Sequence, residues 1–145
     1  MLAHHRVLGV EVAAELLSPD AAVAQGAPER IFSLVSQVGA VSHRNLVGMM
    51  LAGRLDDGRL CVLWEPPGKS SLARELMACG PEPLGLPRSL EVLCQLCAGL
   101  DAAHLAGFYH RDLRHERVTF GPDKPEGVVV QLHGLGRLAV LERAG

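Results

Sequence analysis

A Pro-Pro-Gly segment at Pro66, Pro67 and Gly68 constrains the fold most, because it divides the sequence into a strand-rich part and a helix-rich part. Proline lacks a backbone N–H and glycine favours turns, so a strand ends here. Residues 46–55 and 59–64 are apolar runs separated by Asp-Asp-Gly, a sequence typical of a β-hairpin turn. We therefore predict two adjacent antiparallel strands that end at a linker between two subregions.

The first subregion also carries one strand pattern and one helix pattern. Residues 7–17 are apolar and valine-containing and are followed by a turn signal at 18–20, which predicts a strand. A helix is expected to begin near Pro28, since proline is favoured in a first turn. Its apolar residues recur at spacings of three and four and form one face: Ile31, Leu34, Val35, Val38 and Val41.

The second subregion is mainly helical. Residues 71–79 predict a short helix followed by a proline-rich loop, and residues 89–105 predict the longest helix, which ends at Gly107. The predicted buried face of the long helix consists of Leu90, Leu93, Cys94, Cys97 and Leu100. Two short strands at 118–120 and 128–132, joined by a polar loop, are expected to finish the chain.

Composition excludes several classes of protein. A chain of 145 residues, 48% apolar and 21% charged, is typical of one globular domain. Its net charge of -2 gives no basic field, and no apolar run is long enough to cross a bilayer, so we expect neither nucleic-acid nor membrane partners. The N-terminus does not resemble a signal peptide, and we expect His4 and His5 to lie in a frayed terminus.

The four cysteines do not have the density of a disulfide scaffold. We interpret the Cys94-x-x-Cys97 pair as buried thiols on a helix face, because no second pair or suitably placed histidine completes a tetrahedral metal site. We therefore expect no metal centre and an intracellular, cytoplasmic location.

The motif that carries chemistry is HRDLRHERV at residues 110–118, followed by HGLG at residues 133–136. It resembles the catalytic loop of protein kinases, in which H-R-D-L-x-x-x-N follows a long helix and precedes two strands leading to D-F-G. Residues 42–47 resemble the segment between the kinase αC helix and strand β4, and residues 59–72 resemble strand β5, the hinge and the start of αD. Three landmarks occur in the correct order, and the resemblance covers residues 10–139.

The resemblance implies an α+β, partial protein-kinase-like fold. N-lobe strands with the αC helix would be followed by the first helices and the catalytic loop of the C-lobe. A single truncated domain would then occupy residues 1–145, with N-lobe residues 1–65, hinge residues 66–69 and C-lobe residues 70–145.

Phosphoryl transfer requires a phosphate-binding lysine, a glutamate that holds it, two magnesium ligands and an aspartate that orients the hydroxyl nucleophile. The resemblance places Glu15 at the lysine position, and the first lysine of the chain is Lys69. It places Leu34 at the αC glutamate position, whereas Glu29 lies five residues too early. The resemblance thus implies that both members of this ion pair are absent.

The catalytic loop keeps Asp112 at the position of the base, and Arg114 keeps positive charge where the family usually has lysine or arginine. Arg117 stands at the asparagine position and Gly134 at the metal-binding aspartate of D-F-G. A guanidinium cannot ligate a cation, so both magnesium ligands are predicted to be missing.

The hinge is also predicted to be a poor adenine site. With Trp64 as gatekeeper, Glu65 and Pro67 fall at the cofactor-binding positions, and Pro67 lacks the N–H that the family donates to adenine. The unpaired acceptor would cost about 1 to 3 kcal/mol if buried. We expect no cofactor, with ATP and magnesium as the alternative.

Simpler structural roles remain open for the motif residues. Asp112 could accept backbone N–H bonds as a loop carboxylate, and the resemblance suggests that His110 packs with Leu135 and Val38 in an internal spine. We expect Arg111 to meet solvent or a carboxylate. We also expect a second apolar flank of the long helix to be exposed or covered by a partner.

The leading hypothesis is a catalytically inactive protein-kinase-like domain, a pseudokinase, that acts as a protein-binding or regulatory module with an unidentified protein partner. The alternative is an atypical or truncated ATP-dependent protein kinase that phosphorylates serine, threonine or tyrosine of a protein, with Asp112 as base. A third hypothesis is an incomplete product of a longer kinase-related gene.

Overall fold

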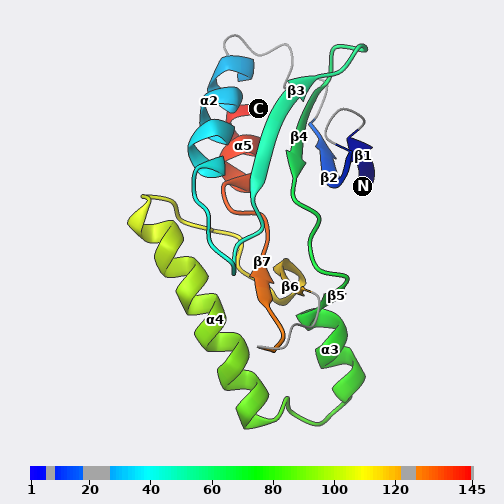
Figure 1. The fold of residues 1–145 in the computed structure, drawn as a ribbon, viewed down its shortest axis with the longest axis vertical. Coiled ribbons are helices and arrows are strands. Elements are labelled where there is room, and N and C mark those ends of the chain that lie inside the picture. The colour runs from blue at the N-terminus through cyan, green and yellow to red at the C-terminus, as the bar shows by residue number, and fades with distance from the viewer. Residues whose placement is uncertain (6–8, 18–26, 122–126, 145) are drawn as a thin grey trace.

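The computed structural model describes residues 1–5, 9–17, 27–121 and 127–144. It has an α+β architecture (Figure 1). A four-stranded sheet and two helices, α2 (Ala27–Gly39) and α5 (Arg137–Ala144), form one end, and a mainly helical part with a three-stranded sheet forms the other. The predicted α+β fold class is confirmed.

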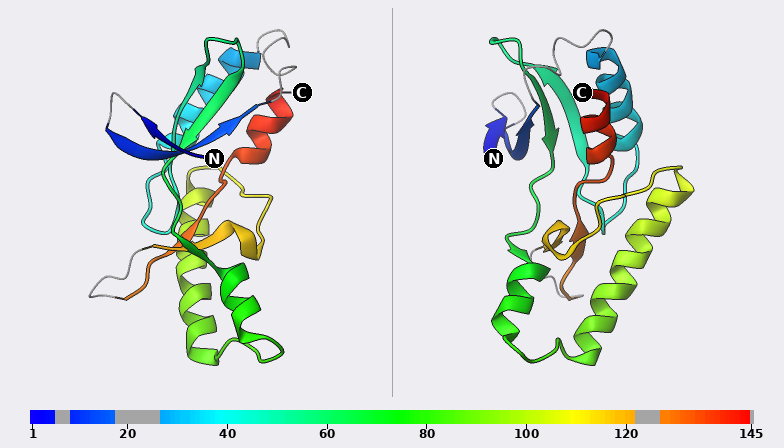
Figure 2. Two further views of the ribbon diagram at one scale, coloured as in Figure 1. Left: turned by 90° about the vertical axis from the view of Figure 1, so that its right-hand side faces the viewer. Right: turned by 180° about the vertical axis from the view of Figure 1, so that it is seen from behind.

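The larger sheet has the strand order β1-β2-β4-β3, and every neighbouring pair is antiparallel. Its strands are β1 (Leu2–His5), β2 (Val10–Leu16), β3 (Met49–Arg54) and β4 (Leu60–Trp64). The predicted hairpin is the pair β3 and β4, and Asp57 stabilises its turn by accepting a hydrogen bond from the Arg59 backbone N–H at 3.0 Å. Helices α2 and α5 lie side by side on one side of this sheet (Figure 2).

The second part combines helices with short strands. Its elements are β5 (Ser70–Ser71), α3 (Leu72–Cys79), α4 (Leu86–Leu105), the 3-10 turn η1 (His115–Arg117), β6 (Val118–Phe120) and β7 (Val130–Leu132). The Ser71 hydroxyl caps α3 by accepting a hydrogen bond from the Arg74 N–H at 3.3 Å. The linker at Gly68 lies against the backbone of Phe120, so closely that a side chain at this position would collide with it.

Asn45 fastens the segment after α2 to the second part. Its side-chain amide donates to the Val130 carbonyl at 2.6 Å and to the Gln95 side chain of α4 at 2.8 Å. Gln95 in turn accepts a hydrogen bond from the Val130 N–H at 2.9 Å. Asn45 is buried, so this network satisfies polar groups that water cannot reach.

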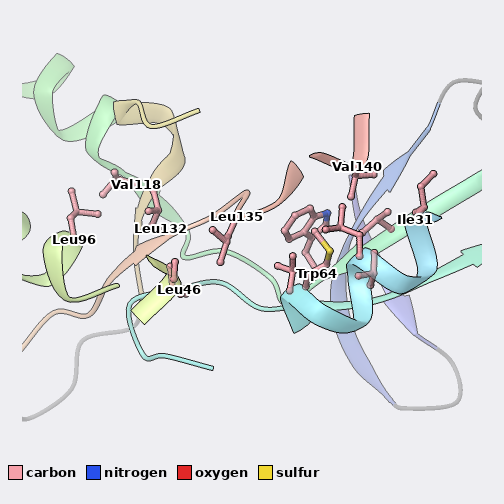
Figure 3. Close-up of a cluster of buried hydrophobic side chains, with 14 of the residues drawn as sticks. Ile31, Leu46, Trp64, Leu96, Val118, Leu132, Leu135 and Val140 are labelled. Carbon is pink, nitrogen blue, oxygen red and sulfur yellow. The ribbon is translucent and has the colours of Figure 1, made fainter. Parts of the chain in front are cut away.

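The hydrophobic core is continuous from one part to the other (Figure 3). Ile31 and Trp64 lie at the end with the larger sheet, and Leu96 of α4 lies at the other end. Leu46, Leu135 and Leu132 occupy the space between them in Figure 3. Four of the five residues of the predicted α2 face, Ile31, Leu34, Val35 and Val38, are buried, which confirms that prediction.

The predicted buried face of the long helix is wrong for four of its five residues, and only Leu100 packs against the core, partly buried. Helix α4 buries Val92, Leu96, Gly99 and Ala103, whereas Leu90 and Leu93 are 51% and 55% exposed. Cys94 and Cys97 are exposed as well, so they are not the buried thiols that we predicted. The helix carries two apolar faces, and the one with small residues packs against the protein because glycine and alanine permit close approach.

Several boundaries also differ from the predictions. His4 and His5 belong to strand β1, not to a frayed terminus, and α4 begins at Leu86 instead of Ser89. The chain ends in helix α5, which the sequence analysis missed. Val7, the turn at 18–20 and most of the polar loop before β7 lie outside the described residues.

None of the helices that the structure describes has the length and apolar character needed to cross a membrane.

Candidate functional site

A cleft of about 490 Å³ lies where strand β2, the linker after β4 and the segment between η1 and α5 meet. Five of the predicted site residues line it: Glu15, Glu65, Pro67, Arg117 and Gly134. The apolar part of the lining comes mainly from Ala13, Ala14, Leu16, Val47 and Trp64, and its remaining members are Met1, His133 and Arg137. A concave, largely apolar site with a few converging polar groups is typical of a ligand-binding site.

Glu15 has a cationic partner in the cleft. The Arg137 guanidinium, at the start of α5, lies 2.7 Å from the Glu15 carboxylate of β2. Both side chains are about one quarter exposed, so this ion pair is partly shielded from water. It ties the larger sheet to the segment that follows β7.

Asp112 is held by the arginine at the predicted asparagine position. Arg117 donates to the Asp112 Oδ2 atom twice, from Nε at 3.0 Å and from Nη2 at 2.8 Å, and Arg114 approaches the other oxygen at 3.4 Å. The hydrogen bonds from Arg117 lower the pKa of the Asp112 carboxyl below its ordinary value, and the positive charges of Arg117, Arg114 and Arg137 add to this effect. Asp112 is therefore ionised at neutral pH.

His110 is buried, and its ring holds the segment around Asp112 through two polar contacts. Its Nδ1 atom accepts a hydrogen bond from the Asp112 N–H at 3.3 Å, and its Nε2 atom lies 3.1 Å from the His133 carbonyl oxygen. Both contacts are satisfied by a neutral ring protonated at Nε2. Burial lowers the pKa of His110, which favours that neutral form.

Arg111 meets a carboxylate, one of its two predicted partners. It donates to Glu142 of α5 through Nη1 at 3.1 Å and through Nη2 at 3.0 Å. Its backbone φ of +58° lies in the left-handed region, which is strained for a residue with a side chain. The loop and α5 are thus joined by an ion pair.

Gly134 and Gly136 shape the turn between β7 and α5. Both have positive φ angles, +97° and +77°, which glycine adopts without strain. A side chain at Gly136 would also approach Val38 of α2 to 2.9 Å. The turn brings Arg137 to Glu15 and buries Leu135 in the core.

Glu65 is engaged by the chain itself. Its backbone N–H donates to the Gly48 carbonyl at 2.9 Å, and its carboxylate accepts a hydrogen bond from the Gly48 N–H at 2.9 Å. Pro67 lines the cleft from the linker. At this wall of the cleft the backbone N–H groups of Glu65 and Gly48 are already paired within the protein.

Three predicted site residues do not line the cleft. Asp112 is not among the lining residues, although it is bonded to Arg117, which is. Leu34 lies on the buried face of α2, with 5% of its surface exposed. Arg114 contacts Asp112 but not the cleft, and half of its side chain is exposed. Arg137, which brings a second guanidinium into the cleft, was not predicted as a site residue. Its position directly after HGLG was visible, but its pairing with Glu15 depends on α5, which was not predicted.

Both guanidinium groups of the cleft lining, Arg117 and Arg137, belong to ion pairs. Within the described residues, no group of three or more histidine, cysteine, aspartate or glutamate side chains is arranged to hold a metal ion. The two guanidinium groups that line the cleft are each paired with a carboxylate through contacts of 3.0 Å or less: Arg137 with Glu15, and Arg117 with Asp112 behind the lining. Such pairs fix geometry and lower the affinity of each member for an incoming charge.

The sequence matches no protein-family model. It is 34% identical over 111 residues to the serine/threonine-protein kinase pkn2 of Myxococcus xanthus. The aligned region covers 77% of this chain and 13% of that protein. It is 27% identical over 111 residues to cyclin-dependent kinase F-1 of Oryza sativa subsp. japonica. Here the aligned region covers 74% of this chain and 22% of that protein.

The comparison with solved structures confirms the predicted partial protein-kinase-like fold. The kinase domain of PknI from Mycobacterium tuberculosis matches with a TM-score of 0.75 and 20% sequence identity, over 93% of this chain and 53% of that one. The chain thus spans about half of that kinase domain and less than a quarter of either curated relative.

Proposed function

We propose that this chain is a catalytically inactive kinase-like domain that acts as a protein-binding or regulatory module. The chain belongs to the protein kinase superfamily and has a partial protein-kinase-like fold. The observation that carries the inactive part of the proposal is the pair formed by Asp112 and Arg117. A base for phosphoryl transfer must accept the proton of a hydroxyl nucleophile. Here one carboxylate oxygen accepts two guanidinium hydrogen bonds instead.

The positive charge of Arg117 also opposes metal-dependent catalysis. Magnesium normally bridges the phosphates of ATP and neutralises developing charge in the transition state. A fixed guanidinium, only 14% exposed, repels a divalent cation at this place. Gly134 offers no side chain for a metal, and Glu15 would repel a phosphate group.

The outer surface of α4 supports the protein-binding part of the proposal. Leu86, Leu90, Leu93 and Cys97 recur at spacings of four, three and four, and with the adjacent Cys94 they form an exposed stripe along the helix. Exposed apolar residues at this repeat are typical of contact with another helix. We therefore expect a helical segment of a protein partner to bind along this stripe.

A phosphoryl-transfer assay tests the inactive part. The chain, with ATP, magnesium and a mixture of serine, threonine and tyrosine peptides, should transfer no phosphate to the peptides or to itself. Asp112→Asn serves as the matched control. Transfer that depends on magnesium and disappears in Asp112→Asn would establish the alternative, an atypical or truncated protein kinase.

Affinity capture from native cell extract tests the binding part. The wild-type chain and a variant carrying Leu90→Glu and Leu93→Glu should melt at similar temperatures, because both side chains are half exposed. A true partner should be retained by the wild type and lost by the variant. Identical sets of retained proteins would exclude the stripe as the binding surface.

A further inference from the structure

A cluster of charged side chains lies at and behind one wall of the cleft, and it contains more guanidinium groups than carboxylates. Arg117 and Arg114 contact Asp112, and Arg137 contacts Glu15 while also acting electrostatically on Asp112. Three guanidinium groups thus surround two carboxylates. Arg117 and Arg137 line the cleft itself, with side chains 14% and 28% exposed.

We propose that Arg117 and Arg137 form a latent, metal-independent anion site for phosphate-bearing ligands, and that Glu15 and Asp112 keep it closed as internal counter-anions. This inference rests on the proposed function, because it explains how a kinase-like cleft is kept from taking up phosphate groups. In this arrangement the anionic groups are part of the chain, and the cations that would meet a ligand are already satisfied.

The geometry at Arg117 is that of anion recognition. Its Nε and Nη2 atoms donate side by side to one oxygen of Asp112, at 3.0 and 2.8 Å. A planar guanidinium offers the same paired donors to a phosphate oxygen. Asp112 therefore occupies the place that a phosphate oxygen would take.

Glu15 and Asp112 outcompete a dissolved phosphate for the two guanidinium groups because the fold holds both carboxylates in place. A group held in place by the fold competes at an effective concentration of millimolar or above, while a dissolved ligand must first lose its freedom of motion. Breaking a partly buried pair by removing one partner leaves a charge without compensation, and that charge then favours an external counter-ion. Replacing either carboxylate by the amide of the same shape should thus free its guanidinium partner to bind an external anion.

Trp64 provides the readout, because it lines the cleft and is the single tryptophan of the chain. The probe is inorganic tripolyphosphate without magnesium, titrated while tryptophan fluorescence and the melting temperature are recorded. The variants are Glu15→Gln, Asp112→Asn and their combination, which are nearly isosteric and can be tested separately if one fails to fold. Glu142→Gln is the matched control, since its carboxylate pairs with Arg111 outside the cleft lining.

The wild type and Glu142→Gln should show no saturable binding at millimolar tripolyphosphate. Glu15→Gln or Asp112→Asn should bind it at least tenfold more tightly, and adding Arg137→Gln to Glu15→Gln should abolish the gain. Folded variants that bind no better than the wild type would overturn the inference. Equal binding of citrate would also overturn it, because the site would then not select phosphate.

These results are separable from a failure of the proposed function. Magnesium-dependent phosphoryl transfer by the wild type would refute inactivity whatever the variants do. A wild type without transfer whose folded variants do not bind tripolyphosphate would leave inactivity standing and refute the latent site alone.

Discussion

Asp112 and Arg117 form the most tightly bonded contact of the catalytic-loop segment, and the contact links folding to pH. The pKa of Asp112 is lowered in the folded protein, mainly by the hydrogen bonds from Arg117. A carboxyl with a depressed folded pKa stabilises the fold above its unfolded pKa, about 3.9, and this contribution is lost as the pH falls through the lower folded value.

Arg117→Gln should therefore lower the melting temperature at pH 7, and its difference from the wild type should shrink as the pH falls below about 4. Thermal melts between pH 7 and pH 2.5 measure this difference. Arg74→Gln, at an exposed position of α3, is the control and should follow the wild type at every pH. A difference that stays constant down to the lowest pH would show that the charge of Asp112 does not stabilise the fold.

His110 predicts a second dependence on pH, at higher values. Burial lowers the pKa of His110 in the folded protein, so its contribution is complete above the unfolded pKa, about 6.5, and declines as the pH falls through the folded value. The pKa of His133 is lowered for the same reason.

The melting temperature of the wild type should fall between pH 7.5 and pH 5, and His110→Gln should reduce that fall while lowering stability at pH 7.5. His4→Gln, on the exposed part of β1, should leave the profile unchanged. An unchanged profile in His110→Gln would mean that other groups carry the dependence.

Helix α4 shows which part of the fold the sequence can predict and which part it cannot. Its existence, its end near Gly107 and the neighbouring β-hairpin followed from local patterns. Its orientation did not, because it carries two apolar faces and hydrophobicity alone favoured the wrong one. Gly99 favours the observed face, because this side of α4 packs so closely against Asn45 that a side chain at position 99 would approach the Asn45 carbonyl oxygen to 3.0 Å.

Leu96 and Leu93 give a matched test of that orientation. Leu96→Ala should destabilise the protein by about 2 to 5 kcal/mol, because it removes a buried side chain from the core. Leu93→Ala, on the exposed stripe, should cost about 0.5 kcal/mol or less. Denaturant unfolding measures both, and equal costs would contradict the observed face.

Helix α5 explains why the candidate site was predicted only in part. Glu15, Pro67, Arg117 and Gly134 were identified from the resemblance to kinase motifs, which depends on short stretches of sequence. The partner of Glu15 was not, because Arg137 reaches it across the cleft from a helix that lies against α2. Contacts between elements far apart in sequence depend on packing that no local pattern encodes.

At the scale of the whole molecule, the continuous core joins the larger sheet to the helical part. We therefore expect the two parts to unfold together. Tryptophan fluorescence reports the sheet through Trp64, and far-ultraviolet circular dichroism reports mainly the helices. The two melting curves should coincide, whereas separate transitions would show that the parts fold independently.

A thermal melt of the purified chain shows whether the kinase-like cleft takes up ATP and magnesium, which phosphoryl transfer requires. The chain is melted alone, with ATP, and with ATP plus magnesium. A ligand at 100 times its dissociation constant stabilises the native state by about 2.7 kcal/mol, a shift that is easily measured. We expect one cooperative transition that neither addition moves. A magnesium-dependent rise in the melting temperature with ATP would contradict this expectation.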